Sequence, residues 1–335
     1  MPRRLINALR NESGDQMKER IGYFDSAKAI LITMVVVGHI LNYANPDYSI
    51  LPYTLAQSFI TSFHMSAFFV VSGILVDTEK WRQCPCVDYI VRRIKSLMIP
   101  YFFFETIAIL YKSFVLKSVS PIDGLKNTVT LRCNVGADWF LPAMFFASIL
   151  FLGYIKLNKK TIWAIVAGTA TLLLYFMPVG HWQGVLFQAA LGFSFMVFGN
   201  ILKRHLTSFT HLKVIAAFVM TAVCAAVSLK FSINNDYYSG VLQCPPLCFV
   251  SGICGTYFVL GIARYIQFKW VRFIGENSLV IMGTHQLVLY TVPHNSSFVW
   301  IIGAFGLIAV IEPLVILATN KLCPFLIGKS KKKSA

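Results

Sequence analysis

Charged residues are scarce in this chain. Only 13% of its 335 residues are Asp, Glu, Lys or Arg, whereas 56% are hydrophobic. An ordinary soluble domain carries roughly a quarter charged residues. This composition excludes a water-soluble domain and indicates an integral membrane protein.

Metal-binding and repeat patterns are also missing. The eight cysteines do not show the spacing of a zinc site or of a redox pair. Cys84 and Cys86 fall in a loop that we predict to be cytoplasmic, where thiols stay reduced. We therefore expect no metal. We also find no internal repeat of the kind that many transporters carry.

Long apolar windows are abundant instead. A window of about 20 apolar residues spans the bilayer core at ~1.5 Å per residue. Unpaired backbone groups in lipid force each window into a helix, which can be broken where it lines a cavity. We therefore predict an all-α integral membrane bundle of about ten transmembrane helices. The ten windows lie near residues 24–43, 54–76, 99–116, 139–155, 161–177, 183–202, 212–229, 246–265, 277–292 and 298–319.

The basic residues indicate how this bundle is oriented. With alternating spans and a cytoplasmic N-terminus, 25 of the 30 Lys and Arg residues fall in cytoplasmic segments and 5 in outer segments. This bias predicts that both termini are cytoplasmic in a multi-pass protein of the inner (plasma) membrane. It also explains the net charge of +16 without nucleic-acid binding.

We expect three parts along the chain: a cytoplasmic N-terminal arm over residues 1–22, a transmembrane domain over 23–322, and a basic cytoplasmic tail over 323–335. The first apolar window is too long for the core of a signal peptide and lacks a small-residue cleavage site. We therefore expect it to remain as an uncleaved span.

Three ionisable residues share one face of the first predicted helix. At 100° per residue, Lys28 lies within about 20° of His39 and Asp25 within about 40°. Because ionisable groups avoid lipid, this face should look into protein or water. Lys28 would lie near the cytoplasm, with His39 ~16 Å further along the axis as a titratable base. The alternatives are a snorkelling Lys28 and a structural hydrogen bond for His39.

Other ionisable residues lie at membrane depth in the remaining windows. His64, in the second window, should reach a depth comparable to that of His39, so the two could meet between helices. Asp138 and His181 fall at outer helix ends and Glu276 at an inner end, where solvation is easier. Glu105, His285, Glu312 and Glu276 could equally be hydrogen-bonding groups of the bundle.

A basic segment precedes the third window. Arg92, Arg93 and Lys95 come shortly before Pro100 on the predicted cytoplasmic side, where a helix N-terminus also favours an anion. Paired arginines bind phosphate well, although isolated arginines on the cytoplasmic side often only set the orientation of a membrane protein. A ligand with several negative charges and a long thin reactive arm would fit this arrangement, with its charges at the basic cytoplasmic residues and its arm reaching the deep histidine. Coenzyme A has this shape.

Several motifs together resemble one family. With ten predicted helices, the chain resembles the acyltransferase 3 family of integral membrane O-acyltransferases, and within it the branch of fucose 4-O-acetylases. The first motif is a basic residue followed by ten residues and a histidine, here Lys28 and His39. The matching stretches are "YFDSAKAILITMVVVGHI", "FHMSAFFVVSGIL", "YIVRRIKSLMIPY", "DWFLPAMFF" and "GENSLVIMGTHQLVL".

This resemblance implies transfer of an acyl group, commonly acetyl from acetyl-CoA, to a hydroxyl of an envelope sugar, lipid-linked glycan or peptidoglycan. The chain departs from many members in having lysine rather than arginine at position 28. Lysine keeps the charge but loses the planar fork that pairs with phosphate, which weakens the case for direct donor contact by Lys28. No soluble domain is expected after the tenth helix.

The resemblance also suggests roles for the site residues. Acetyl-CoA would dock its phosphates at the cytoplasmic mouth, and His39 would act as general base or carry the acetyl group covalently. We expect His39, His64 and Asp25 to be catalytic. We expect the donor to contact Lys28, Arg92, Arg93 and Tyr101, and the acceptor sugar to contact Asp138, Trp139 and His285. Tyr101 and Trp139 could instead be aromatic residues of the membrane interface.

Two functions of other classes remain open on the sequence. A transporter or flippase for a glycan intermediate would use the same buried ionisable residues for proton relay or substrate binding. A structural subunit of a polysaccharide-synthesis complex would tolerate replacement of His39.

Overall fold

The fold is almost entirely helical. In this computed structural model, residues 3–176 and 181–328 are described, with side chains described for 22–176 and 184–328. Within these residues the regular structure consists of helices and one short antiparallel hairpin, in which Asn235 pairs with Leu242 and Asp236 with Val241. The prediction of an all-α bundle is confirmed in this respect.

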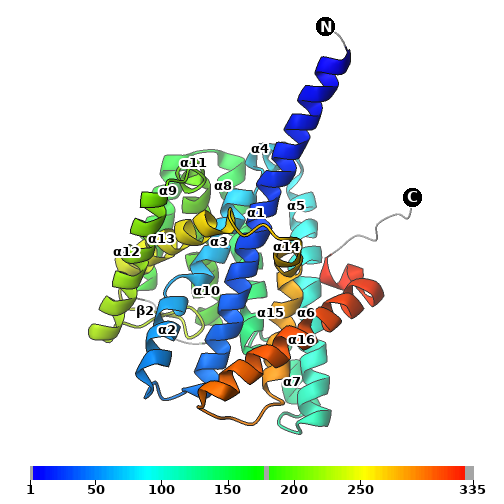
Figure 1. Cartoon of the computed structure of the whole chain (residues 1–335), viewed down its shortest axis with the longest axis vertical. Coiled ribbons are helices and arrows are strands. Elements are labelled where there is room, and N and C mark those ends of the chain that lie inside the picture. Colours follow the sequence, from blue (N-terminus) through cyan, green and yellow to red (C-terminus); the bar gives the residue numbers. More distant parts are fainter. Residues whose placement is uncertain (1–2, 177–180, 329–335) are drawn as a thin grey trace.

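The helices follow one another closely along the chain. Short connections join many helices that pack side by side (Figure 1). Two π-helical turns cover Ile94–Met98 and Tyr111–Val115, and two 3₁₀ turns cover Gly136–Trp139 and Pro324–Ile327. The remaining elements are α1 (Arg3–Ala44), α2 (Leu51–Thr61), α3 (His64–Leu75), α4 (Thr78–Gln83), α5 (Cys86–Arg93), α6 (Ile99–Leu110), α7 (Pro121–Val129), α8 (Phe140–Leu157), α9 (Lys160–Leu174), α10 (His181–Ile201), α11 (Lys203–Leu206), α12 (His211–Lys230), β1 (Asn235–Asp236), β2 (Val241–Leu242), α13 (Pro245–Ala263), α14 (Lys269–Glu276), α15 (Ser278–Leu289) and α16 (Phe298–Leu322).

Eight of the ten predicted windows coincide with helical segments long and apolar enough to cross a membrane. The other two coincide with shorter apolar helices, α9 with 15 residues and α15 with 12 residues. A helix of 12 residues rises only ~18 Å, less than the ~30 Å of a bilayer core. The count of ten spans, and the cytoplasmic placement of both termini, therefore stay predictions.

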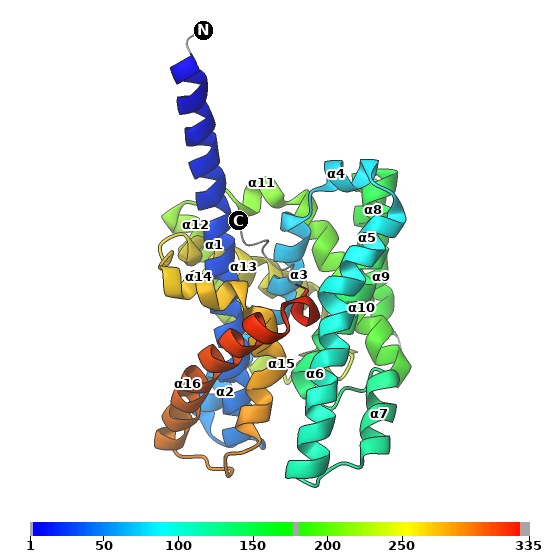
Figure 2. The same cartoon turned by 90° about the vertical axis from the view of Figure 1, so that its right-hand side faces the viewer.

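The centre of the bundle is α3, which packs against α10 on one side and α13 on the other. In Figure 2, α1 and α14 lie to the left of α3, and α5 and α6 lie to its right. Small residues let these helices approach closely. A Cβ atom added to Gly73 would come within 2.1 Å of the Met196 carbonyl oxygen, and one added to Gly199 within 2.4 Å of the Val70 carbonyl oxygen.

The second predicted window is interrupted near its middle. Helix α2 ends at Thr61 and α3 begins at His64, because Phe63 adopts φ −144° and ψ −22° and leaves the helical path. The Ser62 carbonyl freed by this break accepts a hydrogen bond of 2.8 Å from the Ser251 hydroxyl of α13. The break therefore places His64 at the first turn of a new helix, within the interior of the bundle.

Glycine at position 73 should be required for the packing of α3 against α10. We expect Gly73→Ala to lower the free energy of unfolding by at least ~1–3 kcal/mol, because the new methyl group meets the backbone of α10. Gly168→Ala is the matched control, since its Cβ meets nothing within 4 Å and alanine favours a helix by about 0.5–1 kcal/mol. Thermal unfolding of the detergent-solubilised variants checks both. Equal unfolding temperatures for Gly73→Ala and the wild-type protein would contradict close packing of α3 against α10 at this position.

The orientation can be tested with single-cysteine variants. The native Cys86 is exposed at the start of α5, and Asn295 is exposed between α15 and α16. With the other cysteines replaced by serine, a membrane-impermeant maleimide on intact cells should label Asn295→Cys and leave Cys86 unlabelled until the membrane is permeabilised. Labelling of Cys86 in intact cells would reverse the predicted orientation.

Candidate active site

A cavity of about 530 Å³ lies toward the end of the bundle away from the N-terminus, where the last part of α1, α2 and β2 gather (Figure 1). Under the predicted orientation this is the outer side of the membrane. Its wall comes from α1, α2, α3, α12, α13, α15, the 3₁₀ turn Gly136–Trp139 and the segment 233–238. Segments far apart in the sequence therefore meet around one space.

His39 lines this cavity from α1. Its Nδ1 atom is hydrogen-bonded to Gln286 Nε2 of α15 at 2.9 Å. The Gln286 Oε1 atom in turn accepts a 2.8 Å hydrogen bond from the backbone N–H of Ala137. The centroid of the His285 ring, also on α15, lies 5.2 Å from that of the His39 ring. The His39 ring is thus held in one orientation by two other segments of the chain.

His64 lines the same cavity from the first turn of α3. Its Nδ1 atom is 2.8 Å from the Ile60 carbonyl oxygen, which belongs to α2 across the helix break. The expectation that His39 and His64 lie at comparable depth agrees with this shared wall. Neither ring shows a protein hydrogen bond at Nε2 within the described part of the chain, so both present that atom to the cavity.

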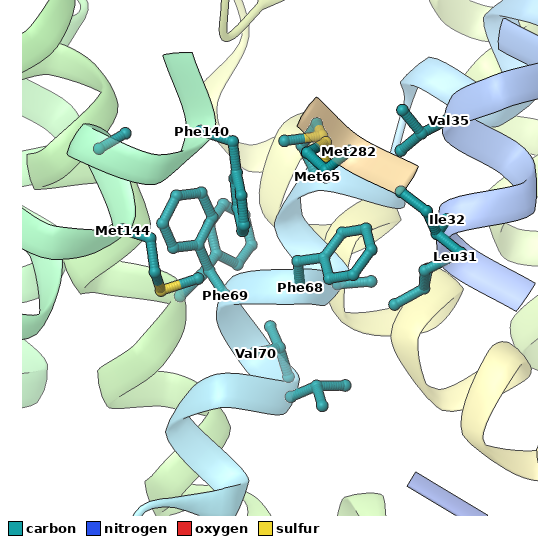
Figure 3. Close-up of a cluster of buried hydrophobic side chains, with 14 of the residues drawn as sticks. Leu31, Ile32, Val35, Met65, Phe68, Phe69, Val70, Phe140, Met144 and Met282 are labelled. Atoms are coloured by element: carbon teal, nitrogen blue, oxygen red, sulfur yellow. The ribbon is translucent and has the colours of Figure 1, made fainter. Parts of the chain in front are cut away.

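Hydrophobic side chains close the cavity on the side of Lys28. Val35, Met65 and Met282 line the cavity and also belong to the buried core. Figure 3 shows these three residues beside Ile32 and Phe68. These side chains lie between the cavity and the other end of α1. The cavity therefore has an apolar floor.

Polar and aromatic groups form much of the remaining wall. The Gln57 amide group donates to the Asn42 side-chain oxygen at 3.2 Å, while the Gln57 Oε1 atom is buried and has no partner among the described residues. The Trp139 ring stacks near the Tyr237 ring, with centroids 6.3 Å apart. The Tyr237 hydroxyl shares a 2.5 Å hydrogen bond with the Ser66 hydroxyl. Trp139 lines the cavity, as its predicted substrate-binding role requires.

Sequence reasoning missed Asn42, Gln57, Tyr237 and Gln286. The first three are ordinary polar or aromatic residues, and no spacing marks them. Gln286 had a weak signal, because it follows His285 directly within an otherwise apolar helix. Its amide contacts His39 across 247 positions of sequence, which no local pattern encodes.

The structure corrects the placement of Asp138. We expected a solvated carboxyl group near the outer surface, but Asp138 is fully buried and lies against Glu105 instead of the cavity. Residues three apart eclipse one another in a 3₁₀ turn, so Gly136 and Trp139 share the cavity face while Asp138 points elsewhere. Neither carboxyl oxygen accepts a hydrogen bond from the described donors.

Two further site predictions are corrected by burial. His285 does not line the cavity: it is fully buried, with Nδ1 2.6 Å from the Ile281 carbonyl oxygen of its own helix. Tyr101 is also fully buried, and its hydroxyl donates to the Thr128 carbonyl oxygen at 2.9 Å. Its hydroxyl is therefore engaged inside the bundle, away from a cytoplasmic mouth.

Asp25 is separated from the cavity. Its carboxylate forms an ion pair of 2.6 Å with Lys28, one turn along α1. Fourteen residues of helix place Asp25 ~21 Å from His39 along the axis, so a direct catalytic contact with the same reacting group is excluded in this arrangement. The physical reason is the rise of the helix: a shared face does not bring residues to the same depth.

The arginines predicted to bind the donor lie on α5. Arg92 stacks over Trp81 at 5.5 Å, while Arg93 stacks over Tyr89 at 5.0 Å and donates to its hydroxyl at 3.1 Å. In Figure 2, α5 and α1 stand on opposite sides of α3, and within the described part of the chain Lys28 contacts neither arginine through a shared hydrogen bond or ion pair. A single binding site containing all three groups is therefore not assembled here.

The buried glutamates join parts of the bundle, as one of our two interpretations expected. The Glu105 carboxylate accepts hydrogen bonds from the Asn134 backbone and side-chain amides at 2.7–2.9 Å and from the Thr128 hydroxyl at 2.9 Å. Glu312 lies 2.9 Å from the Thr284 hydroxyl of α15. Glu276 is exposed at the end of α14.

Some predictions fall outside the described residues. The side chains of His181 and of residues 1–21, and residues 329–335 of the basic tail, belong to this group. Among the described residues no cluster of three or more His, Cys, Asp or Glu side chains could hold a metal ion.

Comparison with known proteins identifies the family. The family model described as an acyltransferase domain matches residues 21–319, and so includes the whole wall of the cavity. The chain belongs to this acyltransferase 3 family. It is a multi-pass membrane protein of that family, while the fucose 4-O-acetylase-like branch stays a prediction.

Two curated relatives align with parts of this chain. Nodulation protein NolL of Mesorhizobium japonicum is 29% identical over 214 residues, which are 58% of this chain and 54% of the relative. Nodulation protein NolL of Sinorhizobium fredii is 30% identical over 162 residues, 47% of this chain and 42% of the relative. The chain thus spans about half the length of the curated relatives it matches. No solved structure matches it.

The hydrogen bonds of Glu105 predict a structural role for this residue. We expect Glu105→Ala to lower the thermal unfolding midpoint strongly, because the loss of the buried acceptor leaves the Asn134 backbone N–H unpaired at ~1–3 kcal/mol and removes the bonds from the Asn134 and Thr128 side chains. Thr106→Ala is the matched control, since Thr106 is exposed and its hydroxyl bonds only its own helix. An unfolding midpoint of Glu105→Ala equal to that of the control would disprove the role.

Proposed function

We propose that this protein is a membrane O-acyltransferase. It would move an acetyl or other short acyl group from cytosolic acyl-CoA to a hydroxyl of an envelope or extracellular glycan or of a lipid-linked sugar. The observation that carries the proposal is the cavity, in which His39 and His64 face the same space. Membership of the acyltransferase 3 family supports this chemistry.

The chemistry of the cavity wall favours a sugar as the acceptor. Sugars offer many hydroxyl groups and apolar ring faces, and they are bound by side-chain amides, carboxylates and aromatic rings. Asn42, Gln57, Asp236, Trp139 and Tyr238 supply these groups around the two histidines. The unpartnered Gln57 Oε1 atom is an acceptor that a sugar hydroxyl could satisfy. The cavity of about 530 Å³ lies within the usual range for small-molecule sites.

The acyl donor would reach the histidines from the opposite end of the bundle. Lys28 is about one-third exposed there and lies ~16 Å from His39 along α1, and Arg92 and Arg93 carry further positive charge on α5. Between Lys28 and His39 the path crosses the apolar floor around Phe68 (Figure 3). An acyl chain and a thioester are compatible with such a lining. The floor side chains must move apart to admit them, so donor entry requires a rearrangement.

Removal of the deep histidine tests the proposal. We expect His39→Ala to reduce release of CoA from labelled acetyl-CoA, and any self-acetylation, by about 10²–10⁴-fold in the purified, reconstituted protein. Thr33→Ala is the matched control, because Thr33 is exposed on the same helix, and it should retain wild-type turnover.

Other outcomes distinguish the remaining functions. Donor turnover unchanged in His39→Ala would contradict the catalytic role. Failure of the wild-type protein to bind acetyl-CoA, together with movement of a glycan intermediate across the vesicle membrane, would favour a transporter or flippase.

A further inference from the structure

The two cavity histidines hold their protons on different ring nitrogens. The side-chain amide of Gln286 has one acceptor end and one donor end. The backbone N–H of Ala137 can only donate, so the atom 2.8 Å from it must be the Gln286 carbonyl oxygen. This contact fixes which way the amide group faces.

The fixed amide then determines the tautomer of His39. With its oxygen on Ala137, Gln286 directs its NH₂ group at His39 Nδ1, 2.9 Å away. An NH₂ group can only donate, so Nδ1 must carry a lone pair and the proton of the neutral ring must lie on Nε2. A positively charged ring would put a second proton against the Gln286 NH₂ group. His39 therefore presents an N–H donor to the cavity.

The partner of His64 enforces the opposite tautomer. Its Nδ1 atom lies 2.8 Å from the Ile60 carbonyl oxygen, and a carbonyl can only accept. The proton must lie on Nδ1, which leaves a lone pair on Nε2 facing the cavity. This contact joins the first turn of α3 to the last turn of α2.

The surroundings of each ring agree with this difference. A histidine that accepts a proton is usually supported at its other nitrogen by a carbonyl or carboxylate oxygen, which stabilises the cationic ring. His64 has such an oxygen, whereas His39 has an amide donor, and its neighbour is the His285 ring 5.2 Å away. The ionisable side chains that line the cavity are His39, His64, Tyr48, Asp236, Tyr237, Tyr238 and Cys248.

We propose that His64 is the general base of the transfer, that His39 donates a hydrogen bond to the reacting carbonyl oxygen, and that Gln286 is the positioning residue that keeps His39 in this state. This inference rests on the proposed acyl transfer. It gives the role of base to the histidine of α3, whereas the sequence predicted His39 to be the base or the covalent acyl carrier.

The reaction then balances as follows. The acceptor hydroxyl oxygen attacks the thioester carbonyl carbon while its proton passes to His64 Nε2. The carbonyl oxygen gains negative charge and accepts a hydrogen bond from His39 Nε2–H. The C–S bond breaks, the thiolate of coenzyme A takes the proton from His64, and an ester and a free thiol result.

The tautomers can be measured directly. In protein labelled with ¹⁵N-histidine and held in nanodiscs, NMR distinguishes protonated from bare ring nitrogens, and His39→Asn and His64→Asn variants assign the two rings. We expect His39 to be protonated on Nε2 and His64 on Nδ1. Protonation of His39 on Nδ1 in the wild-type protein would overturn the inference, whether or not acyl transfer is observed.

Replacement of Gln286 by glutamate provides the decisive variant. One carboxylate oxygen can accept from Ala137 N–H as before, while the other accepts from His39 Nδ1, so the proton of His39 should move to Nδ1 and its Nε2 should become bare. We expect Gln286→Glu to lower kcat by about 100-fold, as expected for the loss of one donor to the reacting oxygen. Unfolding midpoints verify that the variant is folded.

An unchanged or higher kcat in Gln286→Glu would point to His39 as the base. If His39 were the base, Gln286→Glu would create a carboxylate–histidine pair and would maintain or raise kcat. That outcome, with the NMR shift of tautomer confirmed, would overturn the assignment of roles. Gln286→Met removes the amide without supplying an acceptor, and its ¹⁵N spectrum should show a mixture of both His39 tautomers. Absence of any acetyl transfer in the wild-type protein would instead refute the proposed function, while the tautomer measurement still decides this inference.

Discussion

The hydrogen bond from the Ala137 backbone to Gln286 sets the chemical character of the cavity. Within a membrane, buried polar groups have no water to satisfy them, so each must meet a protein group of complementary type. A backbone N–H has a fixed role, and it imposes a fixed role on the amide and through it on His39. Three segments distant in sequence therefore have to assemble correctly before the histidine has a defined state.

The same requirement explains the contacts of several other ionisable residues. Glu105 is satisfied by the amide groups of Asn134 and by Thr128, Glu312 lies against Thr284, and Asp25 pairs with Lys28. The Glu105 and Glu312 contacts fasten helices and loops to one another, whereas the Asp25–Lys28 pair lies within α1. The Nε2 atoms of His39 and His64 differ, because no described protein group occupies them and both rings face the cavity. Atoms left unsatisfied in this way are where a substrate can bind.

Much of the fold follows from local pattern, and much of the site does not. Apolar windows predicted every helical segment that can span a membrane, because burial in lipid depends on composition over about 20 residues. The interruption at Ser62 and Phe63 was missed, because both residues also occur inside helices. Helical geometry correctly placed His39 toward the protein interior. It could not show that Asp138 faces Glu105, since that orientation depends on a 3₁₀ turn and on a neighbouring helix.

The amino-acid sequence alone determined the membrane character, the helical class, the family resemblance and the histidine face of α1. All of these depend on residue type and on the fixed geometry of a helix. Only the tertiary structure decided which groups meet: Gln286 with His39, His64 with the Ile60 carbonyl, and Tyr101 with Thr128. The reason is that hydrogen-bond roles at the cavity are set by pairs up to 247 residues apart, and helical periodicity carries no information about partners on other helices.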